Sequence, residues 1–477
     1  MLIFLMFLFM LPSSYEGIVL FKYYRCGLFS HMFLRQALTM MVGLLCVSNL
    51  QAQTYDLKTS IGRALEIHPG VLAAQIDIGI AEAQLDQAKA ARFLPKLEVR
   101  SVLGPSPEAR GDALIGDSNI SLSDLRIFSQ TEASFVQPLY TFGKLGGVRD
   151  AASAGVVAYE AGFLKTKADL ELQVFEVFYG VLLANALWDL AQEAQGDFQK
   201  AREYVAEKLE EDEGDFTYTD LGRIDRFAFD VTEKVNAAKK AKALSESAMR
   251  LLLGLNGVDS LSLDGELASL DAEILPLDFY LGQGDTRAEM QQLKAGIQVR
   301  ESLLRVAKSD QYPQLFLAGQ FKYAYAPNRD DQNSPFAYDP LNLLQTGAVI
   351  GFQQSLSFGL TSAKVKKARL EHQKLIYQTS LARKGVAIEI EKIYRELKEA
   401  ESNLAAAEKA RRATRRWFIA VRDGFNGGFE KASDMIEVVK EYAIIRAKYF
   451  EAVYNFNRAW ARLQRATGKP IVQSLGH

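Results

Sequence analysis

The residue types that most often do chemistry in proteins are scarce in this chain. Its two cysteines, Cys26 and Cys46, both fall in the first 50 residues, and its four histidines are widely scattered. Disulfides, cysteine-ligated zinc, iron–sulfur clusters and thiol nucleophiles are therefore excluded from the rest of the chain. The sequence also lacks P-loop, G-x-S-x-G and H-E-x-x-H motifs. We predict neither an enzyme nor a bound cofactor or metal.

Charge and composition narrow the class of protein further. The 477 residues carry 56 Lys and Arg against 58 Asp and Glu, and 48% of them are hydrophobic. A nucleic-acid-binding protein needs a surplus of basic residues to neutralise phosphates, so we predict no nucleic-acid partner. The apolar content is that of a folded chain rather than a disordered one.

The first 52 residues have the pattern of an export signal. Arg35 precedes an apolar run at 37–47, and the small residue Ala52 follows at a position suited to cleavage. Met32 would serve as a conventional start, in which case residues 1–31 are an upstream mis-start. One or two N-terminal membrane anchors are the alternative, since residues 1–11 are apolar as well.

Proline positions indicate an internal duplication. Two long stretches, 139–275 and 341–469, contain no proline and can form very long helices. Residues recur in the same order with intervals of 6 and 34 in both stretches: Gly214, Asp220 and Gly254 in the first, and Gly428, Asp434 and Gly468 in the second. We predict a first structural repeat at 53–275, a second at 276–470, and a short tail at 471–477.

Apolar residues in the proline-free stretches follow the heptad spacing of coiled coils. Leu187, Ala191, Ala194 and Phe198, for example, step by four, three and four residues. One helix over 145–211 would extend about 100 Å at 1.5 Å per residue. This length predicts an elongated chain with long coiled-coil helices.

Between the helices the period of alternation changes to two, which indicates strands. We predict them at 96–104, 129–139, 314–325 and 346–356, each about as long as a transmembrane β-strand. Polar, Gly-rich and Pro-rich connections link the members of each pair. A half-buried antiparallel sheet in a water-soluble protein is the alternative, because alternation alone does not separate lipid from a protein core.

Four strands cannot close a membrane barrel by themselves. An open strand edge in lipid leaves backbone groups unpaired, which costs several kcal/mol for each group. If the strands lie in a membrane, they must therefore be shared among several subunits that form a ring.

The order of these features resembles the TolC family of outer-membrane efflux channels. The likeness extends over roughly residues 60–468 and includes the segment 137–145, Gln-Pro-Leu-Tyr-Thr-Phe-Gly-Lys-Leu. It implies a mainly α protein with membrane β-strands, in which a homotrimer shares a twelve-stranded outer-membrane barrel. The long helices would continue this barrel as a periplasmic α-barrel.

The same resemblance implies a location and partners. The protein would be the passive exit duct of a tripartite efflux or type I secretion system in the outer membrane of a Gram-negative cell. Its partners would be a periplasmic adaptor protein, an inner-membrane pump of the resistance-nodulation-division or ABC type, and the lipid bilayer. A soluble periplasmic coiled-coil scaffold is the alternative, although it leaves the four strands unexplained.

The resemblance also places two acidic residues at the closed pore aperture, and Asp434 and Glu437 match their positions. Three residues apart on a helix, they share a face. Three copies would give two stacked acidic rings that favour cations. The alternative is that Asp434 caps a helix, with Glu437 completing a capping box.

The two helical tips supply the remaining candidate residues. Gly214, Asp220 and Gly428 are candidate contacts for the adaptor, because they lie where the family has its tips. Acidic residues precede the first tip and basic residues the second, so we predict gate ion pairs among Glu210, Glu211, Arg415, Arg416 and Arg422. Two independently solvated helix faces are the alternative. Glu430 departs from the family, which has a basic residue here.

Overall fold

The structure, a computed structural model, describes residues 54–93, 96–111, 119–211, 216–256, 261–332, 336, 338–427 and 429–474. The signal peptide predicted at 1–52 lies outside the described residues. The elements follow one another in this order: β1 (Thr54–Tyr55), α2 (Leu57–Ile67), α3 (Pro69–Phe93), β2 (Lys96–Arg110), β3 (Asn119–Tyr140), α4 (Lys144–Glu210), α5 (Tyr218–Leu252), β4 (Ser262–Leu263), α6 (Leu277–Leu281), η1 (Gly284–Thr286), α7 (Ala288–Ser309), β5 (Gln314–Tyr325), β6 (Leu343–Gln353), α8 (Leu360–Asn426), α9 (Ala432–Ala466) and α10 (Ile471–Ser474).

The two halves of the chain repeat the same long helices. Helices α4 and α8 have 67 residues each, and α5 and α9 have 35 each. Both 67-residue helices begin after a glycine in the left-handed conformation, Gly143 at φ 90° and Gly359 at φ 82°. A side chain would be strained there, so the matched glycines give the same transition from strand to helix in both halves. The strand pair, the long helix and the shorter helix therefore occur twice.

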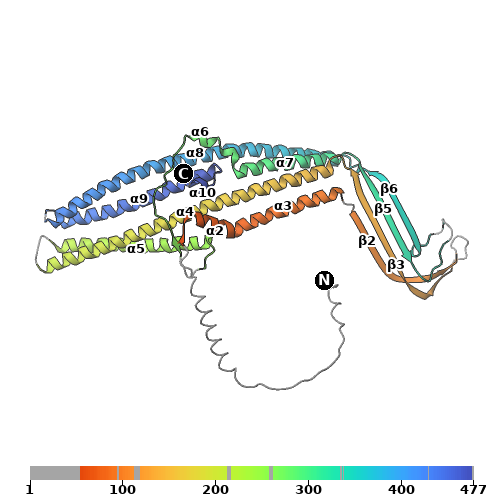
Figure 1. The fold of residues 1–477 in the computed structure, drawn as a ribbon, viewed down its shortest axis with the longest axis horizontal. Helices are drawn as coiled ribbons and strands as arrows, with labels where there is room; N and C mark the ends of the chain where they lie inside the picture. The colour runs from red at the N-terminus through yellow and green to blue at the C-terminus, as the bar shows by residue number, and fades with distance from the viewer. Residues whose placement is uncertain are drawn as a thin grey trace, which may run out of the picture. The chain divides into compact units, whose positions relative to one another are not determined.

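One layer runs through the strands and into the helices. The strands form an antiparallel sheet in the order β2-β3-β5-β6. Each strand adjoins one helix, and α3, α4, α7 and α8 lie side by side in the corresponding order (Figure 1). The predicted fold class, mainly helical with long helices and four antiparallel strands, is confirmed.

The strand boundaries differ from the predicted ones in the first half. The strand predicted at 96–104 continues to Arg110, and the strand predicted at 129–139 begins at Asn119. Pro105 and Pro107 suggested a loop because proline lacks an amide donor. However, β2 is an edge strand of this sheet, where proline is tolerated, and a register shift follows at Ser106. In the second half the 314–325 strand is β5, and the strand predicted at 346–356 is β6, which begins and ends earlier, at Leu343 and Gln353.

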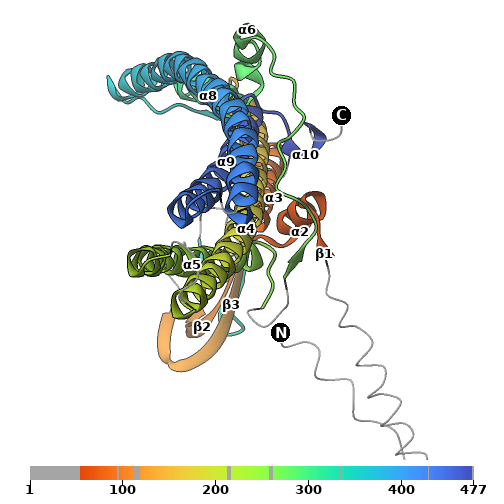
Figure 2. The same ribbon diagram turned by 90° about the vertical axis from the view of Figure 1, so that its left-hand side faces the viewer.

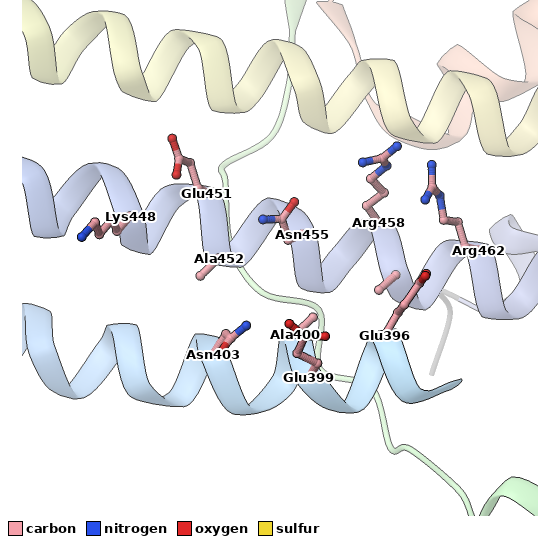
Figure 3. A pocket seen from close by; sticks show the side chains of 11 residues that line it. Glu396, Glu399, Ala400, Asn403, Lys448, Glu451, Ala452, Asn455, Arg458 and Arg462 are labelled. Carbon is pink, nitrogen blue, oxygen red and sulfur yellow. The ribbon is translucent and has the colours of Figure 1, made fainter. Parts of the chain in front are cut away.

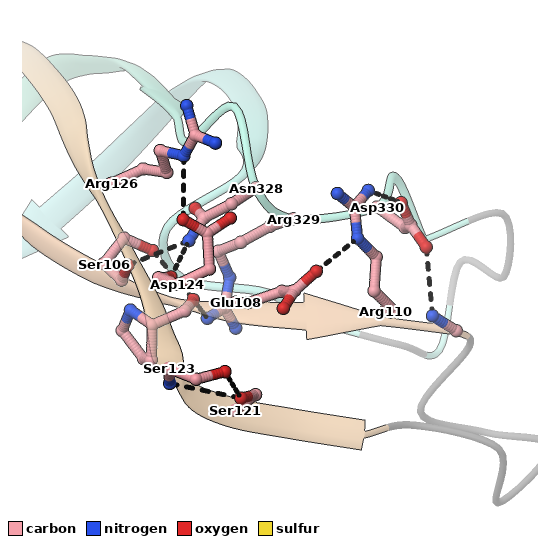
Figure 4. A network of polar contacts seen from close by, with 12 residues as sticks. Ser106, Glu108, Arg110, Ser121, Ser123, Asp124, Arg126, Asn328, Arg329 and Asp330 are labelled. Atoms are coloured by element: carbon pink, nitrogen blue, oxygen red, sulfur yellow. Dashed lines mark hydrogen bonds and ion pairs between the residues drawn. The ribbon is translucent and has the colours of Figure 1, made fainter.

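Beyond the four-stranded part, β2 and β3 continue as a two-stranded ribbon, and the segment after β5 folds onto it (Figure 4). The buried Asn328 side-chain amide donates to the carbonyl oxygens of Ser106 and Asp124, at 3.0 and 2.8 Å. Arg329 pairs with Asp339 at 2.6 Å. These contacts hold the connection between β5 and β6 against the ribbon.

The main hydrophobic core lies where the long helices meet the short elements. Leu170, Val174, Phe175 and Phe178 of α4 are buried there together with Trp460 of α9. Helices α2 and α10 pack against α4 on one flank, seen end-on in Figure 2. By length and composition α4 also contains a stretch apolar enough to span a membrane. This is weak evidence, because the same helix carries much of the protein core.

A buried arginine joins three helices beside this core. Arg465 of α9 pairs with Asp169 of α4 at 2.6 Å and with Glu289 of α7 at 2.5 Å. Burial alone would raise the pKa of Glu289, but the hydrogen bond and the charge of Arg465 outweigh it and lower this pKa from 4.5 to about 2. Arg287, which precedes α7, extends the network to Glu389 of α8 at 2.7 Å. The network fastens the two halves of the chain together.

We expect Arg465→Met to destabilise the protein, because it leaves Glu289 and Asp169 without their shared cation. Breaking a buried ion pair costs about 3–5 kcal/mol, and since Asp169 is partly exposed we expect roughly 2–4 kcal/mol here. Unfolding in detergent, followed by helical circular dichroism, measures the change. Arg395→Met is the matched control, because exposed Arg395 pairs only within its own helix. Equal effects of the two substitutions would contradict the role of the network.

The pKa of Glu289 gives this prediction a pH dependence. A carboxyl group whose pKa is lower in the folded than in the unfolded state stabilises the fold. This stabilisation is complete when the pH lies above the pKa of the group in the unfolded chain. The stability difference between wild type and Glu289→Gln should therefore be full above about pH 4.5 and shrink as the pH falls toward 2. The same unfolding assay, repeated across this range, checks it. A difference that grows on acidification would have the wrong sign.

Candidate functional site

Two helical hairpins end in tips at the opposite end of the helices from the sheet (Figure 1). The first tip connects α4, which ends at Glu210, with α5, which begins at Tyr218. The second connects α8, which ends at Asn426, with α9, which begins at Ala432. The candidate adaptor contacts Gly214 and Gly428 lie outside the described residues.

At the first tip, Asp220 has a structural task. Thr217 caps α5, and its hydroxyl accepts a hydrogen bond from the Asp220 backbone amide at 3.3 Å. In return the Asp220 carboxylate accepts from the Thr217 amide at 3.1 Å, which completes a capping box. The carboxylate of Asp220 is therefore already occupied at the helix start.

At the second tip the equivalent carboxylate is not used as a cap. The residue before α9 is Lys431, which makes no side-chain capping bond. Asp434 lies in the first turn, half-buried, and accepts from the Ser433 hydroxyl at 3.3 Å. The alternative interpretation of Asp434 as a helix cap, with Glu437 in its capping box, is therefore wrong. Glu437 is exposed one turn further along the same face.

Within one chain, the predicted gate residues do not form the predicted ion pairs. Glu211 pairs with Lys208 of its own helix at 2.9 Å, and Arg422 pairs with its neighbour Asp423 at 3.1 Å. Among the described residues no ion pair joins Glu210 or Glu211 to the three arginines, Arg415, Arg416 and Arg422. Ion pairs between neighbouring copies stay a prediction.

Aromatic rings, rather than charges, connect the two tips of one chain. We call Tyr204, Phe216 and Phe425 the tip aromatic cluster. The Tyr204 ring centroid lies 5.8 Å from that of Phe216 and 6.3 Å from that of Phe425, and the last two are 6.2 Å apart. Since Tyr204 lies near the end of α4, Phe216 precedes α5 and Phe425 lies near the end of α8, the cluster links the first hairpin to the second.

Further contacts between the hairpins extend away from the tips. Ile436 of α9 is buried against Phe198 of α4 and Ile224 of α5. Lys440 places its ammonium 4.9 Å from the ring centroid of Phe227, and Arg446 pairs with Glu193 at 2.7 Å. Sequence reasoning missed these contacts, because apolar and aromatic residues at coiled-coil positions carry no sign of which neighbouring hairpin they meet.

The sheet separates charged from uncharged side chains by face. Opposed residues on neighbouring strands point to the same side, so the register assigns every residue to one of two faces. All charged residues of the four-stranded part lie on a single face: Lys96, Glu98, Arg100, Glu132 and Lys322. We call it the charged face.

The opposite face of the sheet is apolar and uncharged. Exposed side chains from all four strands occupy it, namely Leu97, Val99, Leu103, Ile127, Phe321, Tyr323, Leu344, Ile350 and Phe352. At the helix end, Phe142 stacks on Tyr312 at 5.1 Å and meets Tyr140 edge-on at 4.7 Å. Aromatic residues at both ends of an apolar band are typical of a membrane β-sheet.

Between α8 and α9 lies a polar groove of about 350 Å³ (Figure 3). Charged and amide side chains line it, and at its end Arg458 and Arg462 both pair with Glu176 of α4, at 3.0 and 2.7 Å. Among the described residues no group of three or more His, Cys, Asp or Glu is placed to hold a metal ion.

A sheet with one uncharged, apolar face, joined to long helical hairpins, is the arrangement expected of a membrane channel subunit that extends into an aqueous compartment. Residues 285–469 match the family model described as "Outer membrane efflux protein". This match covers the second half of the chain, which is therefore similar in sequence to outer-membrane efflux channel proteins of the TolC type. Such channels work in tripartite efflux systems. A search of curated proteins gives no match.

Solved channel structures share the fold over most of their length. The outer-membrane channel OprN is 14% identical, with 86% of this chain and 89% of OprN covered at a TM-score of 0.70. CmeC of Campylobacter jejuni is 15% identical, with 86% and 85% covered at 0.71. CusC is 16% identical, with 88% and 96% covered at 0.71. At these identities the likeness shows the fold, and the family match carries the function.

We expect Phe425→Ala to loosen the tips, because it removes two of the three ring contacts in the tip aromatic cluster. Aromatic pairs contribute about 0.5–1.5 kcal/mol each, so local opening should become about tenfold more frequent. Hydrogen exchange of the amides at the end of α4 measures this. Phe429→Ala is the control, since Phe429 is 89% exposed and outside the cluster. Unchanged exchange in Phe425→Ala would show that the cluster does not hold the tips.

Proposed function

We propose that three copies of this chain close into a homotrimeric ring that forms a continuous passive duct across the outer membrane and through the periplasm. The observation that carries the proposal is that, in the described part of one chain, the sheet ends in an unpaired strand on each side and the outer helices α3 and α8 expose apolar side chains. A single copy therefore presents two unsatisfied edges that fit each other.

The strand edges need a neighbouring copy more than the helix edges do, because their backbone groups must form hydrogen bonds. Strands β2 and β6 are the outer strands of the sheet, and each leaves a row of backbone amides and carbonyls without a ladder partner in the described part of a single chain. Lipid offers these groups no hydrogen bonds, so pairing β2 of one copy with β6 of the next is the economical solution. This contact joins two different surfaces and closes only as a ring.

The helix edges carry matching apolar stripes. On α3, Leu72, Ile76 and Ile80 recur every four residues and are 45%, 65% and 51% exposed. On α8, Tyr377 and Leu381 have the same spacing and are 65% and 72% exposed. Ile76 is as far from the sheet end of α3 as Tyr377 is from the sheet end of α8, counted along each helix. The two side chains are therefore at the same level in neighbouring copies.

The number of copies follows from the bore that a duct needs. Two copies would supply eight strands, and an eight-stranded barrel has an interior just wide enough to be filled by its own side chains. Three copies supply twelve strands and leave a lumen. The family resemblance supports the same number.

The periplasmic tips form the gated aperture in this proposal. Asp434 is not needed for capping, and Glu437 shares its face, so three copies contribute two acidic rings to a narrow passage. Asp220 lies in the first turn of α5 at the first tip, and we assign it, with Gly214 and Gly428, to the surface on which a periplasmic adaptor protein docks. The duct has no energy source of its own, so an inner-membrane pump of the resistance-nodulation-division or ABC type drives transport.

A disulfide tests the ring directly, because residues 54–477 contain no native cysteine. We expect Ile76→Cys combined with Tyr377→Cys to cross-link neighbouring copies in isolated outer membranes under mild oxidation. Non-reducing gels should then show dimers and trimers of the chain. Ile76→Cys with Ile388→Cys is the control, since Ile388 is exposed on the same stripe but lies about three helical turns further along α8. Cross-linking of the control alone, or of neither pair, would contradict the proposed seam.

The acidic rings make a separate prediction. Asp434→Asn with Glu437→Gln removes six carboxylates from the trimer aperture, so the preference for cations should fall. Reversal potentials in planar bilayers under a KCl gradient measure the K⁺/Cl⁻ permeability ratio. Asp423→Asn is the control, because Asp423 is an exposed tip carboxylate on α8 rather than on α9, and it pairs with its neighbour Arg422. An unchanged ratio in the double variant would refute the acidic-ring assignment.

A further inference from the structure

We propose that the membrane part of the duct contains an anion-favouring ring, built from Arg100, Glu132 and Lys322 on the charged face. The inference rests on the proposed function, because the ring exists only in the closed trimer. It assigns the exit end of the duct a charge preference opposite to that of the acidic aperture. Its ligands are small inorganic anions and anionic groups of the cargo.

The strand register creates the ring. Arg100 of β2 is opposite Glu132 of β3, Glu132 is opposite Lys322 of β5, and Lys322 is opposite Gln345 of β6. Directly opposed side chains have Cβ atoms about 4.5–5.5 Å apart, so the four residues form one row across the strands. We call them the charged row. Each copy contributes two cations and one carboxylate to this level of the barrel.

The other charges of the same face cancel. Lys96 and Glu98 form an ion pair with each other, and the remaining rows of the four-stranded part contain no charged residue. Glu132 also accepts a hydrogen bond from Gln320 at 3.0 Å. The excess positive charge of the barrel lining is therefore concentrated in the charged row, at one cation per copy and three per trimer.

Basic residues also follow the sheet, at the end away from the charged row. The segment 360–374, which begins α8, contains Lys364, Lys366, Lys367, Arg369 and Lys374, all exposed, against the single carboxylate of Glu371. The start of a helix carries the positive end of its dipole, so cations are disfavoured there. In the other half of the chain, the matching positions of α4 hold Val148, Asp150, Ala151, Ser153 and Ala158. The equivalent stretch of the first half, 144–158, contains only two basic residues, Lys144 and Arg149.

The charged row and the acidic aperture give the duct two filters of opposite sign. A low-dielectric barrel wall focuses the field of its charges into the lumen, which raises the local concentration of counter-ions. At 0.1 M salt the field reaches about 10 Å from each charge, and at 1 M only about 3 Å. The ring therefore acts most strongly at low salt, close to the exit.

Reversal potentials of the full-length trimer in planar bilayers test the ring, with KCl as the probe. Arg100→Gln with Lys322→Gln should lower the Cl⁻/K⁺ permeability ratio about twofold or more at 0.1 M salt and less at 1 M. Glu132→Gln should raise the ratio, because it removes the only carboxylate of the charged row. Both shifts should be larger when Asp434→Asn and Glu437→Gln have weakened the aperture filter.

Substitutions that conserve charge distinguish an electrostatic effect on the permeability ratio from an effect of altered side-chain packing. Arg100→Lys with Lys322→Arg keeps the charge and should leave the ratio unchanged. The inference is overturned if the neutralised variants conduct like wild type and keep its permeability ratio. It is also overturned if Glu132→Gln shifts the ratio in the same direction as the neutralised pair. A wild-type protein that neither forms trimers nor conducts would instead contradict the proposed function.

Discussion

An unpaired strand edge is the constraint on which the rest of the structure depends. Strands β2 and β6 end the sheet on either side, and an apolar outer face commits that sheet to lipid, where free amides and carbonyls have no alternative partner. The same opening continues into the helices as exposed apolar stripes on α3 and α8. Pairing the edges of neighbouring copies would give the backbone groups of the strands their hydrogen bonds and would bury the apolar stripes of the helices. The proposed ring thus follows from the two edges of the layer.

The long helices transmit this geometry to the tips. Arg465 and its partners join α4, α7 and α9 at mid-length, so the two hairpins leave the core in a fixed relation. At the tips the tip aromatic cluster and the contacts of Ile436 keep the hairpins of one chain together. In the proposed duct the carboxylates of Asp434 and Glu437 lie at the periplasmic aperture, and the charged row lies in the membrane. A charged cargo would therefore meet both preferences in series.

The fold was largely predictable from the sequence, but the contacts at the site were not. The missing prolines predicted the long helices, and the helix predicted at 145–211 agrees closely with α4 at both ends, because proline breaks helices locally. The extension of β2 through Pro105 and Pro107 was missed, since only the sheet shows that β2 is an edge strand. Acidic and basic runs suggested ion pairs between the tips, yet in one chain aromatic rings connect them. The charged row was also beyond prediction, because alternation identifies faces but not the register between strands.

The native mass of the protein, extracted in mild detergent from isolated outer membranes, tests the central claim most directly. The account predicts a single species of three protomers, stable at low protein concentration, because each copy has two edges to cover. A monomer or dimer recovered from the soluble periplasmic fraction would contradict it. Such a result would mean that the sheet edges and apolar stripes are covered in some other way than by a ring of copies.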